Sequence, residues 1–204
     1  MSLLCMEDSM AFDFKKDRAA LIVVDMQKGF LDEGAAMEVP PGRAVIPNIR
    51  RLIDCCRDVD VPIIYTRFVY SPKVPNLIGE LHSQHKPPIC CCMLGDESVE
   101  IVPELQPTAG DLVVDKHGYD AFQNTNLDYT LRSLKREQLI VTGVMTDICV
   151  LATVTSALHH EYQVWVVSDG TATLWDDVQE FTLNLCRRAY GHVETTDVLT
   201  DRLT

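Results

Sequence analysis

Three residues with potential chemical roles, Asp25, Lys116 and Cys149, each lie at or just beyond the end of an apolar run. An acid, a cation and a thiol together suit nucleophilic catalysis. The thiolate is the attacking species, and both the start of a helix and the Lys116 ammonium would favour the anion of Cys149. Asp25 could accept the thiol proton and return it to a leaving amine. Backbone N–H groups between Met145 and Cys149 could bind an oxyanion.

The elements that must position these residues alternate between strands and helices. Strands are predicted at 19–25, 62–68, 111–116, 138–144, 163–169 and 192–196, and helices at 44–58, 126–134, 147–160 and 176–190. The near-continuous apolar runs are typical of strands buried on both faces of a parallel sheet. Unbroken alternation predicts one α/β domain over 1–204, with an N-terminal extension at 1–17. Ligand sites in such sheets lie beyond the carboxyl ends of the strands, where we expect all three residues to meet.

Composition narrows the partners and the compartment. The chain has 204 residues, a net charge of −12 and 47% hydrophobic residues. Such an acidic protein repels phosphate backbones, so neither nucleic acid nor an anionic membrane is expected as a partner. The sequence shows no apolar stretch of membrane-spanning length and no secretory signal, which predicts a cytoplasmic protein. We therefore expect its eight cysteines to be free thiols.

Each candidate also has an ordinary interpretation. Asp25 could cap the helix that follows, Lys116 could be a solvated surface charge, and Cys149 could be inert packing. Their predicted meeting at one rim favours function over these separate explanations. A dinucleotide-binding domain is excluded, because the segment 25–34 reads DMQKGFLDEG and lacks the required glycine pattern.

Four segments resemble the motifs of isochorismatase-like hydrolases. They are LIVVDMQKGFLDEG (21–34), DKHGYDAFQNTNLDYTLR (115–132), LIVTGVMTDICVLATVTSAL (139–158) and RRAYGHVETTDVL (187–199). The third segment carries the most specific pattern, Gly-Val-x-Thr-Asp-x-Cys-Val. Order and spacing agree from about Ala19 to Leu199, which is nearly the whole chain.

The resemblance implies a Rossmann-like three-layer α/β/α fold and a triad of Asp25, Lys116 and Cys149. It also implies a cis peptide between Val144 and Met145, with the N–H groups of Met145 and Cys149 as the oxyanion hole. Family members that cleave the vinyl ether of isochorismate lack the cysteine, so its presence here favours hydrolysis of an amide, urea or carbamoyl C–N bond through a thioester. A small-molecule substrate, no cofactor, and a homo-dimer or homo-tetramer are the corresponding expectations.

Five residues are candidates for binding substrate. The run DAFQNTNLD resembles the branch of biuret, carbamoylsarcosine and ureidoacrylate hydrolases, in which Phe122 and Gln123 would line the pocket. Phe30 is the aromatic residue of the first motif. Arg67 could bind a carboxylate bidentately, or be a surface charge. Trp175 could cover the pocket or lie in a subunit interface, and Phe122 could equally be core.

The segment 70–98 leaves several questions open. It reads as a long loop, and its residues His82 and His85 could bind a metal, although solvated histidines are favoured. The Asp-x-His metal motif of nicotinamidases is absent after Ile63, so no metal is expected. The three cysteines 90–92 depart from the family pattern and leave the substrate unidentified. Two alternatives stay open: a catalytically silent member that acts as a binding or scaffold protein, and a hydrolase of an isochorismate-type vinyl ether.

Overall fold

The computed structural model describes residues 13–71, 73, 77–83 and 91–204. The strands are β1 (Ala19–Val24), β2 (Ile63–Phe68), β3 (Leu112–Lys116), β4 (Gln138–Val144), β5 (Gln163–Ala172) and β6 (His192–Glu194). The α-helices are α1 (Lys28–Leu31), α2 (Gly42–Asp58), α3 (Leu77–Ser83), α4 (Leu127–Ser133), α5 (Leu151–His159), α6 (Asp176–Ala189) and α7 (Thr196–Leu203). Three short 3-10 helices are η1 (Lys16–Arg18), η2 (Glu97–Val99) and η3 (Pro103–Leu105), whereas η4 (Thr146–Val150) is a π-helix.

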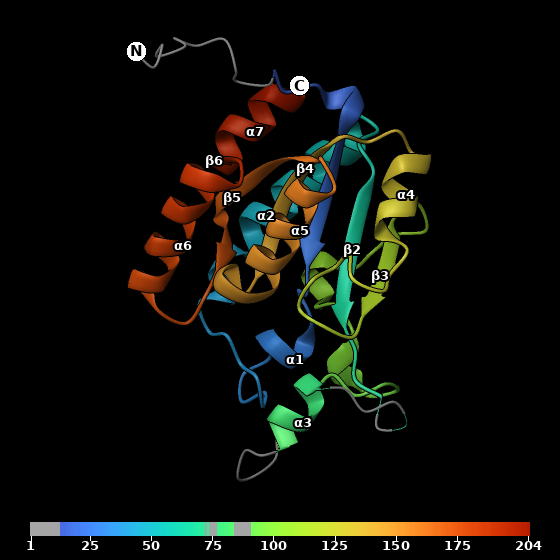
Figure 1. Ribbon diagram of the computed structural model, residues 1–204, viewed down its shortest axis with the longest axis vertical. Helices are drawn as coiled ribbons and strands as arrows, with labels where there is room; N and C mark the ends of the chain where they lie inside the picture. Colours follow the sequence, from blue (N-terminus) through green and yellow to red (C-terminus); the bar gives the residue numbers. More distant parts are fainter. Residues whose placement is uncertain (1–12, 72, 74–76, 84–90) are drawn as a thin grey trace, which may run out of the picture.

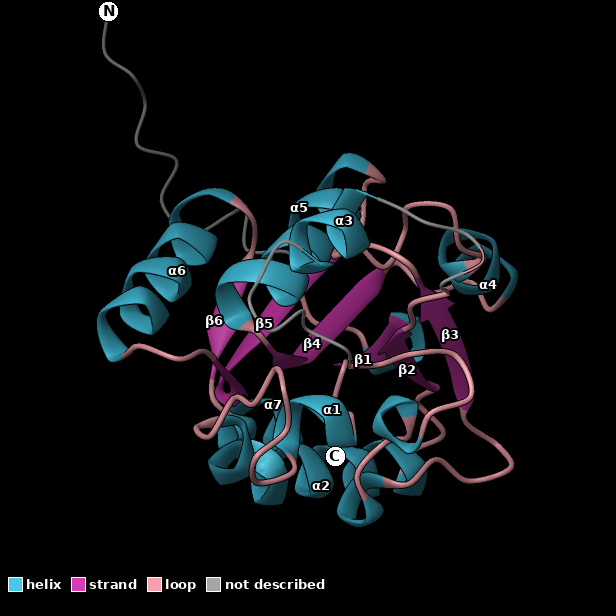
Figure 2. Cartoon of the chain, turned by 90° about the horizontal axis from the view of Figure 1, so that it is seen from below, coloured by secondary structure: helices cyan, strands magenta, loops and turns pink. Residues whose placement is uncertain are grey.

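The six strands form one parallel sheet in the order β3-β2-β1-β4-β5-β6, which confirms the predicted fold class. Helices cover both faces (Figures 1 and 2), with α1, α2 and α7 on one side and α4, α5 and α6 on the other. The strand order reverses direction between β1 and β4. In open parallel sheets, the crevice at such a switch point is where ligands bind, so the ends of β1 and β4 frame the expected site.

The two core layers follow from the alternation of side chains along each strand. In β1, Ala19, Leu21 and Val23 pack into the cluster beneath α2, whereas Ala20, Ile22 and Val24 pack into the cluster beneath α5. All six residues are fully buried, which is why this strand reads as an unbroken apolar run. Burial on both faces fixes the position of β1, and therefore the position of the acid that follows it.

The structure differs from the sequence prediction in several segments, and the predicted loop 70–98 contains the helix α3 and the beginning of η2. The predicted helix 147–160 begins one residue earlier and opens as the π-helix η4 before α5 continues it. Strand β5 runs on to Ala172, past the predicted end at 169, because a register irregularity between Val141 and Gly143 of β4 lets it continue pairing. The last helix, α7, was not predicted, since its apolar positions are few, and Thr195 caps it through its side chain.

The beginning of the chain joins the core sooner than expected. The predicted extension covered residues 1–17, of which residues 1–12 lie outside the described structure. The ring of Phe14 packs edge-on against Trp165 at 5.3 Å between centroids, and the Lys15 N–H donates to Gln138. Residues 13–17 therefore belong to the packed domain.

Gly143 has a conformation that other residues cannot adopt. Its φ is +108°, and a Cβ built on it would collide with the carbonyl oxygen of Val24 on the neighbouring strand. We expect Gly143→Ala to lower the free energy of unfolding by about 3 kcal/mol or more. Gly110→Ala is the matched control, because that position has open space and should change stability by less than about 0.5 kcal/mol. Urea denaturation measures both, and equal stabilities would contradict the assignment of strain to Gly143.

Among the described residues, the helices are too short or too polar for any of them to cross a bilayer. The expected dimer or tetramer stays a prediction.

Candidate active site

Asp25 and Lys116 form a fully buried ion pair at the carboxyl end of the sheet. Asp25 follows β1 and Lys116 ends β3, and the Lys116 Nζ lies 2.7 Å from the Asp25 Oδ2, both side chains having no exposed surface. Lys116 is aligned with Phe68 at the end of β2, so its side chain crosses the end of β2 to reach the acid. Such a pair is stable only because each charge is compensated by the other.

Thr66 holds the Asp25 carboxylate in place. The Thr66 hydroxyl donates to the Asp25 Oδ1 at 2.6 Å, and the Asp25 N–H reaches the carbonyl oxygen and the hydroxyl of Thr66, each at 3.2 Å. Asp25 has φ +51°, a left-handed conformation that aspartate tolerates better than most residues. The backbone thus turns sharply after β1, and the carboxylate has a single fixed direction.

Cys149 lies in η4, 6% exposed, with its thiol against both members of the ion pair. Burial raises its pKa to about 12, the Lys116 ammonium opposes that rise, and the Asp25 carboxylate adds to it. Lys116 therefore lowers the pKa of Cys149, as expected, but by less than burial raises it. In the free protein Cys149 carries its proton, and Asp25 is the neighbouring group able to accept it.

Lys116 keeps its charge in this setting. Burial lowers its pKa, but the Asp25 carboxylate and the Cys149 sulfur raise it by more, so the net pKa is above the ordinary lysine value. Its ammonium also donates to the Gly118 carbonyl oxygen at 2.9 Å and lies 5.0 Å from the centre of the Phe68 ring. A fixed positive charge therefore stands beside the Cys149 thiol.

The pKa of Cys149 predicts slow, pH-dependent alkylation. Because the thiolate fraction rises until the pH passes about 12, the rate of modification by iodoacetamide should increase throughout pH 7 to 10. The raised pKa also links folding stability to pH. The stabilising contribution of the protonated Cys149 thiol is fully present below the unfolded pKa of about 8.5, and it is lost as the pH rises from there through the folded pKa of about 12. Peptide mapping by mass spectrometry would follow Cys149 alone, with N-acetylcysteine as the reference. A plateau in the rate below pH 9 would contradict the assigned pKa.

Met145 joins the end of β4 to the start of η4. The peptide bond between Val144 and Met145 is cis, and the Met145 carbonyl oxygen accepts from the N–H groups of Ile148 and Val150, both at 3.1 Å. The first N–H groups of a helix point away from its body and lack intrahelical acceptors. Met145 and Cys149 thus place backbone amides at the beginning of η4, next to the thiol.

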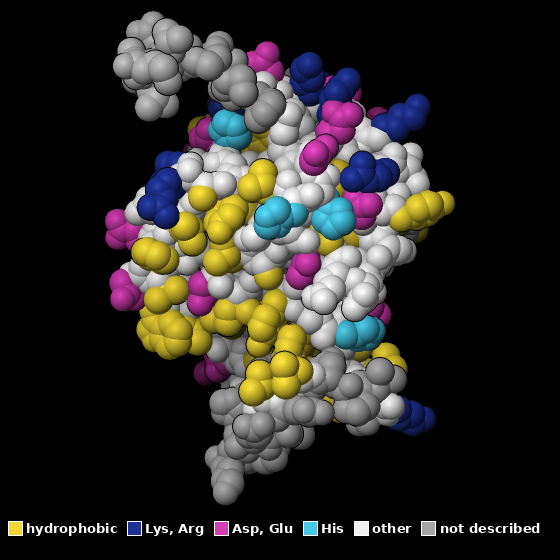
Figure 3. Space-filling model, viewed as in Figure 1, with side chains coloured by type: hydrophobic (Ala, Val, Ile, Leu, Met, Phe, Trp, Pro, Cys, Tyr) yellow, Lys and Arg dark blue, Asp and Glu magenta, His cyan; other side chains and the backbone are white. Residues whose placement is uncertain are grey.

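A cavity of about 440 Å³ opens over Cys149. Phe30 and Trp175, two of the residues expected to bind substrate, are part of its lining, and Trp175 is 58% exposed at its edge. The remaining lining residues are Ala36, Met37, Glu38, Val39, Phe68, Tyr119, Met145, Asp147, Ile148 and Leu174. Hydrophobic side chains gather around and below α5 and α6 on the outer face of the molecule (Figure 3). An apolar pocket with a few polar groups is the usual form of a small-molecule site.

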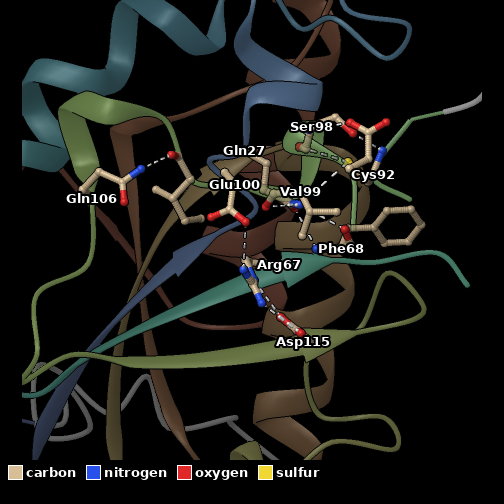
Figure 4. Close-up of polar contacts among 11 residues, drawn as sticks. Gln27, Arg67, Phe68, Cys92, Ser98, Val99, Glu100, Gln106 and Asp115 are labelled. Carbon is tan, nitrogen blue, oxygen red and sulfur yellow. Dashed lines mark hydrogen bonds and ion pairs between the residues drawn. The ribbon is translucent and has the colours of Figure 1, made fainter. Parts of the chain in front are cut away.

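Three of the five substrate-binding predictions do not fit this cavity. The guanidinium of Arg67 bonds to Asp115 at 2.7 and 3.0 Å and lies 3.8 Å from the Glu100 carboxylate (Figure 4), and Arg67 is not among the described residues that line the cavity. Its neighbours on β2 are Thr66, which bonds to Asp25, and Phe68, which lines the cavity, and alternation along the strand sends Arg67 to the other face. Phe122 is a core residue stacked on His160, and Gln123 lies in a separate surface hollow with His117.

Gln27 is a structural residue of the site that the sequence analysis missed. Its buried side chain donates to the carbonyl oxygens of Phe68 and Val99, both at 3.0 Å, and accepts from the Phe68 N–H at 2.7 Å (Figure 4). It thereby ties the turn after β1 to the end of β2 and to η2. A polar side chain directly after an apolar strand and its terminal acid was the signal that could have revealed it.

The structure describes two of the three adjacent cysteines 90–92, but not the side chains of His82 and His85. Cys91 and Cys92 are buried, with their sulfurs 3.9 Å apart, and pack against Gly29. Cys90, His85 and the side chain of His82 lie outside the described residues. Within the described part of the chain, no three His, Cys, Asp or Glu side chains are grouped to hold a metal ion.

Known proteins are similar to this chain both in sequence and in the arrangement of the strands. The model of the isochorismatase domain matches residues 19–198. The chain belongs to the isochorismatase family. Within this family it is similar to the ureidoacrylate amidohydrolase RutB of Yersinia enterocolitica, with 34% identity over 78% of this chain and 76% of that protein. It is also similar to nicotinamidase 3 of Arabidopsis thaliana, with 33% identity over 89% and 86% of the two chains.

A solved structure of a cysteine hydrolase has the same fold over nearly the whole chain. The crystal structure of a cysteine hydrolase from Pseudomonas syringae pv. phaseolicola superposes with a TM-score of 0.87 at 29% identity, covering 94% of this chain and 95% of the other. The isochorismatase domain thus accounts for the sheet, its helical layers and the segments that carry Asp25, Lys116 and Cys149.

Proposed function

We propose that this protein is a cysteine-dependent hydrolase that cleaves a C–N bond of a small molecule, in an amide, urea or carbamoyl group. The observation that carries this proposal is the thiol of Cys149, which lies against the buried Asp25–Lys116 pair at the floor of an apolar cavity. A thiol, a fixed acceptor for its proton and a fixed cation are what covalent catalysis at a carbonyl carbon requires. The names of similar amidohydrolases and a nicotinamidase agree with it.

The first step of the proposed reaction is acylation. Asp25 takes the Cys149 proton as the sulfur attacks the carbonyl carbon, and Lys116 stabilises the thiolate as it forms. The N–H groups of Met145 and Cys149 donate to the tetrahedral oxyanion. Asp25 then returns the proton to the leaving nitrogen, which departs as ammonia or an amine and leaves a thioester on Cys149.

The second step is hydrolysis of the thioester. A water molecule gives a proton to Asp25 and attacks the acyl carbon through the same oxyanion hole. Collapse of the intermediate releases the carboxylic acid, or carbamate from a urea, and returns the proton to the Cys149 sulfur. Each step begins and ends with the Asp25 carboxylate paired to the Lys116 ammonium.

Ammonia release from a panel of primary amides, ureas and N-carbamoyl acids tests the proposal. We expect the wild-type protein to release ammonia from at least one class, and the Cys149→Ala protein to release none above background. Equal release by both proteins would contradict a cysteine mechanism. Absence of release from every class would favour the alternative of a catalytically silent binding protein.

A further inference from the structure

The charged residues of the cavity over Cys149 are both acids. Among the described residues that line it, Glu38 and Asp147 are charged and the rest are neutral. Glu38 is already paired, because Arg43 donates to its carboxylate at 2.7 Å and the Gly34 N–H donates at 3.0 Å. Asp147 makes no ion pair with any described lysine, arginine or histidine, so its negative charge is uncompensated within the described lining of the cavity.

Asp147 is held in a fixed position two residues before Cys149 on η4. It lies in the first turn of this helix, where the N–H groups favour an anion, and the Thr173 hydroxyl donates to its Oδ1 at 2.5 Å. This hydrogen bond holds the carboxylate in place and comes from a neutral group, so it does not cancel the charge. The carboxylate therefore stands on the same helix as the thiol and faces the space that a substrate must occupy.

Within the described part of the chain, two cations contact residues next to or lining the cavity, and both are already bonded to carboxylates. Lys116 has no exposed surface and its ammonium is committed to Asp25. The Arg43 guanidinium bonds to Glu38 and to the Leu31 carbonyl oxygen. An anionic substrate would consequently lose water without gaining a countercharge, and the apolar walls would strengthen its repulsion from Asp147.

We infer that the cavity takes an uncharged substrate with an apolar, ring-sized acyl group, and that Asp147 excludes substrates that carry a carboxylate. This separates the protein from a ureidoacrylate hydrolase, whose substrate is an anion, although such a hydrolase is among its similar relatives. The apolar walls supplied by Phe30, Met37 and Trp175 suit the acyl group, while the amide carbonyl lies toward the start of η4. The inference rests on the proposed function only where it concerns turnover. The preference for a neutral ligand can be tested by binding alone.

Two ligands of nearly equal shape test the inference, namely methyl 4-carbamoylbenzoate and 4-carbamoylbenzoate. Their affinities for the Cys149→Ala protein can be measured by calorimetry, so that no hydrolysis intervenes. We expect the neutral ester to bind at least about tenfold more tightly. Adding Asp147→Asn should improve the affinity for the anion relative to the ester by about tenfold at low ionic strength.

Two control variants distinguish the effect of the Asp147 charge from a general disturbance of the structure. Asp147→Glu keeps the charge and should retain the preference for the ester. Asp201→Asn removes an exposed acid on the distant helix α7 and should leave the ratio of affinities unchanged. The inference is overturned if the anion binds as tightly as the ester, if neither ligand binds at millimolar concentration, or if Asp147→Asn leaves the ratio as it was.

Turnover distinguishes this inference from the proposed function. If the ester binds preferentially and the wild-type protein also releases ammonia from it, both stand, and Asp147→Asn should lower the KM for the anion more than it changes kcat. If the ester binds preferentially but no ammonia appears, the proposed hydrolase function fails while the inference about the cavity holds.

Discussion

The Cys149→Ala protein should release ammonia from its best amide substrate at least about 10⁴-fold more slowly than the wild-type protein. The alanine removes the atom that would form the thioester, and the remaining groups can only polarise the carbonyl. Because Asp25, Lys116 and the amides of η4 persist, binding of the substrate should change little. The loss should therefore appear in kcat, as measured by continuous ammonia detection under saturating substrate.

Cys55→Ala provides the matched control for this loss. Cys55 is a half-buried cysteine of α2 whose sulfur contacts the Thr200 carbonyl oxygen on the far side of the sheet from Cys149. Its replacement should leave kcat within about twofold of the wild-type value. A Cys149→Ala protein that retained a tenth of the wild-type activity would show that Cys149 is not the nucleophile.

Lys116→Met should cost both stability and activity. Methionine keeps most of the apolar stem but leaves the Asp25 carboxylate buried without a countercharge, and breaking such a pair costs about 3–5 kcal/mol of unfolding free energy. Loss of the charge that stabilises the thiolate and the oxyanion should also lower kcat by about 100-fold or more. Urea denaturation and steady-state kinetics measure the two effects on the same protein.

A double variant separates the two effects. Asp25→Asn combined with Lys116→Met removes both charges, so it should recover most of the lost unfolding free energy and none of the activity. Arg18→Met is the control, because the Arg18–Glu137 pair has half-exposed side chains and its loss should cost less than about 1 kcal/mol. A Lys116→Met protein as stable as the Arg18→Met protein would contradict the assigned energetic role of the buried pair.

The sheet and the edge of it that carries Asp25, Lys116 and Cys149 could be predicted because their signals are local. A strand buried on both faces is mostly apolar, so β1 and β4 are recognisable from the sequence, and parallel connections bring their carboxyl ends to one edge. Asp25 comes directly after β1, and Cys149 lies in η4, the helix that follows β4. The sequence also predicted Lys116 at the same edge, although only the register of β3 against β2 shows how its ammonium reaches Asp25.

Phe30 and Trp175 could be predicted for the wall of the cavity, but most of the wall could not, because it comes from segments without a period. Met37 and Val39 belong to the connection before α2, and Leu174 and Trp175 belong to the turn before α6. Their positions depend on tertiary packing, which no local pattern encodes. Arg67 is the exception that alternation could have corrected, since its neighbour Thr66 faces Asp25 and consecutive strand residues face opposite ways.

The central claim is that a thioester forms on Cys149, and rapid acid quenching followed by mass spectrometry tests it most directly. The protein would be mixed with its best substrate from the ammonia panel, quenched during turnover and digested. The account predicts that the peptide containing Cys149 gains the mass of the acyl group in place of one hydrogen, and that hydroxylamine removes this gain. Steady ammonia release with no acylated Cys149 peptide at any quench time, and with undiminished release by the Cys149→Ala protein, would contradict the account.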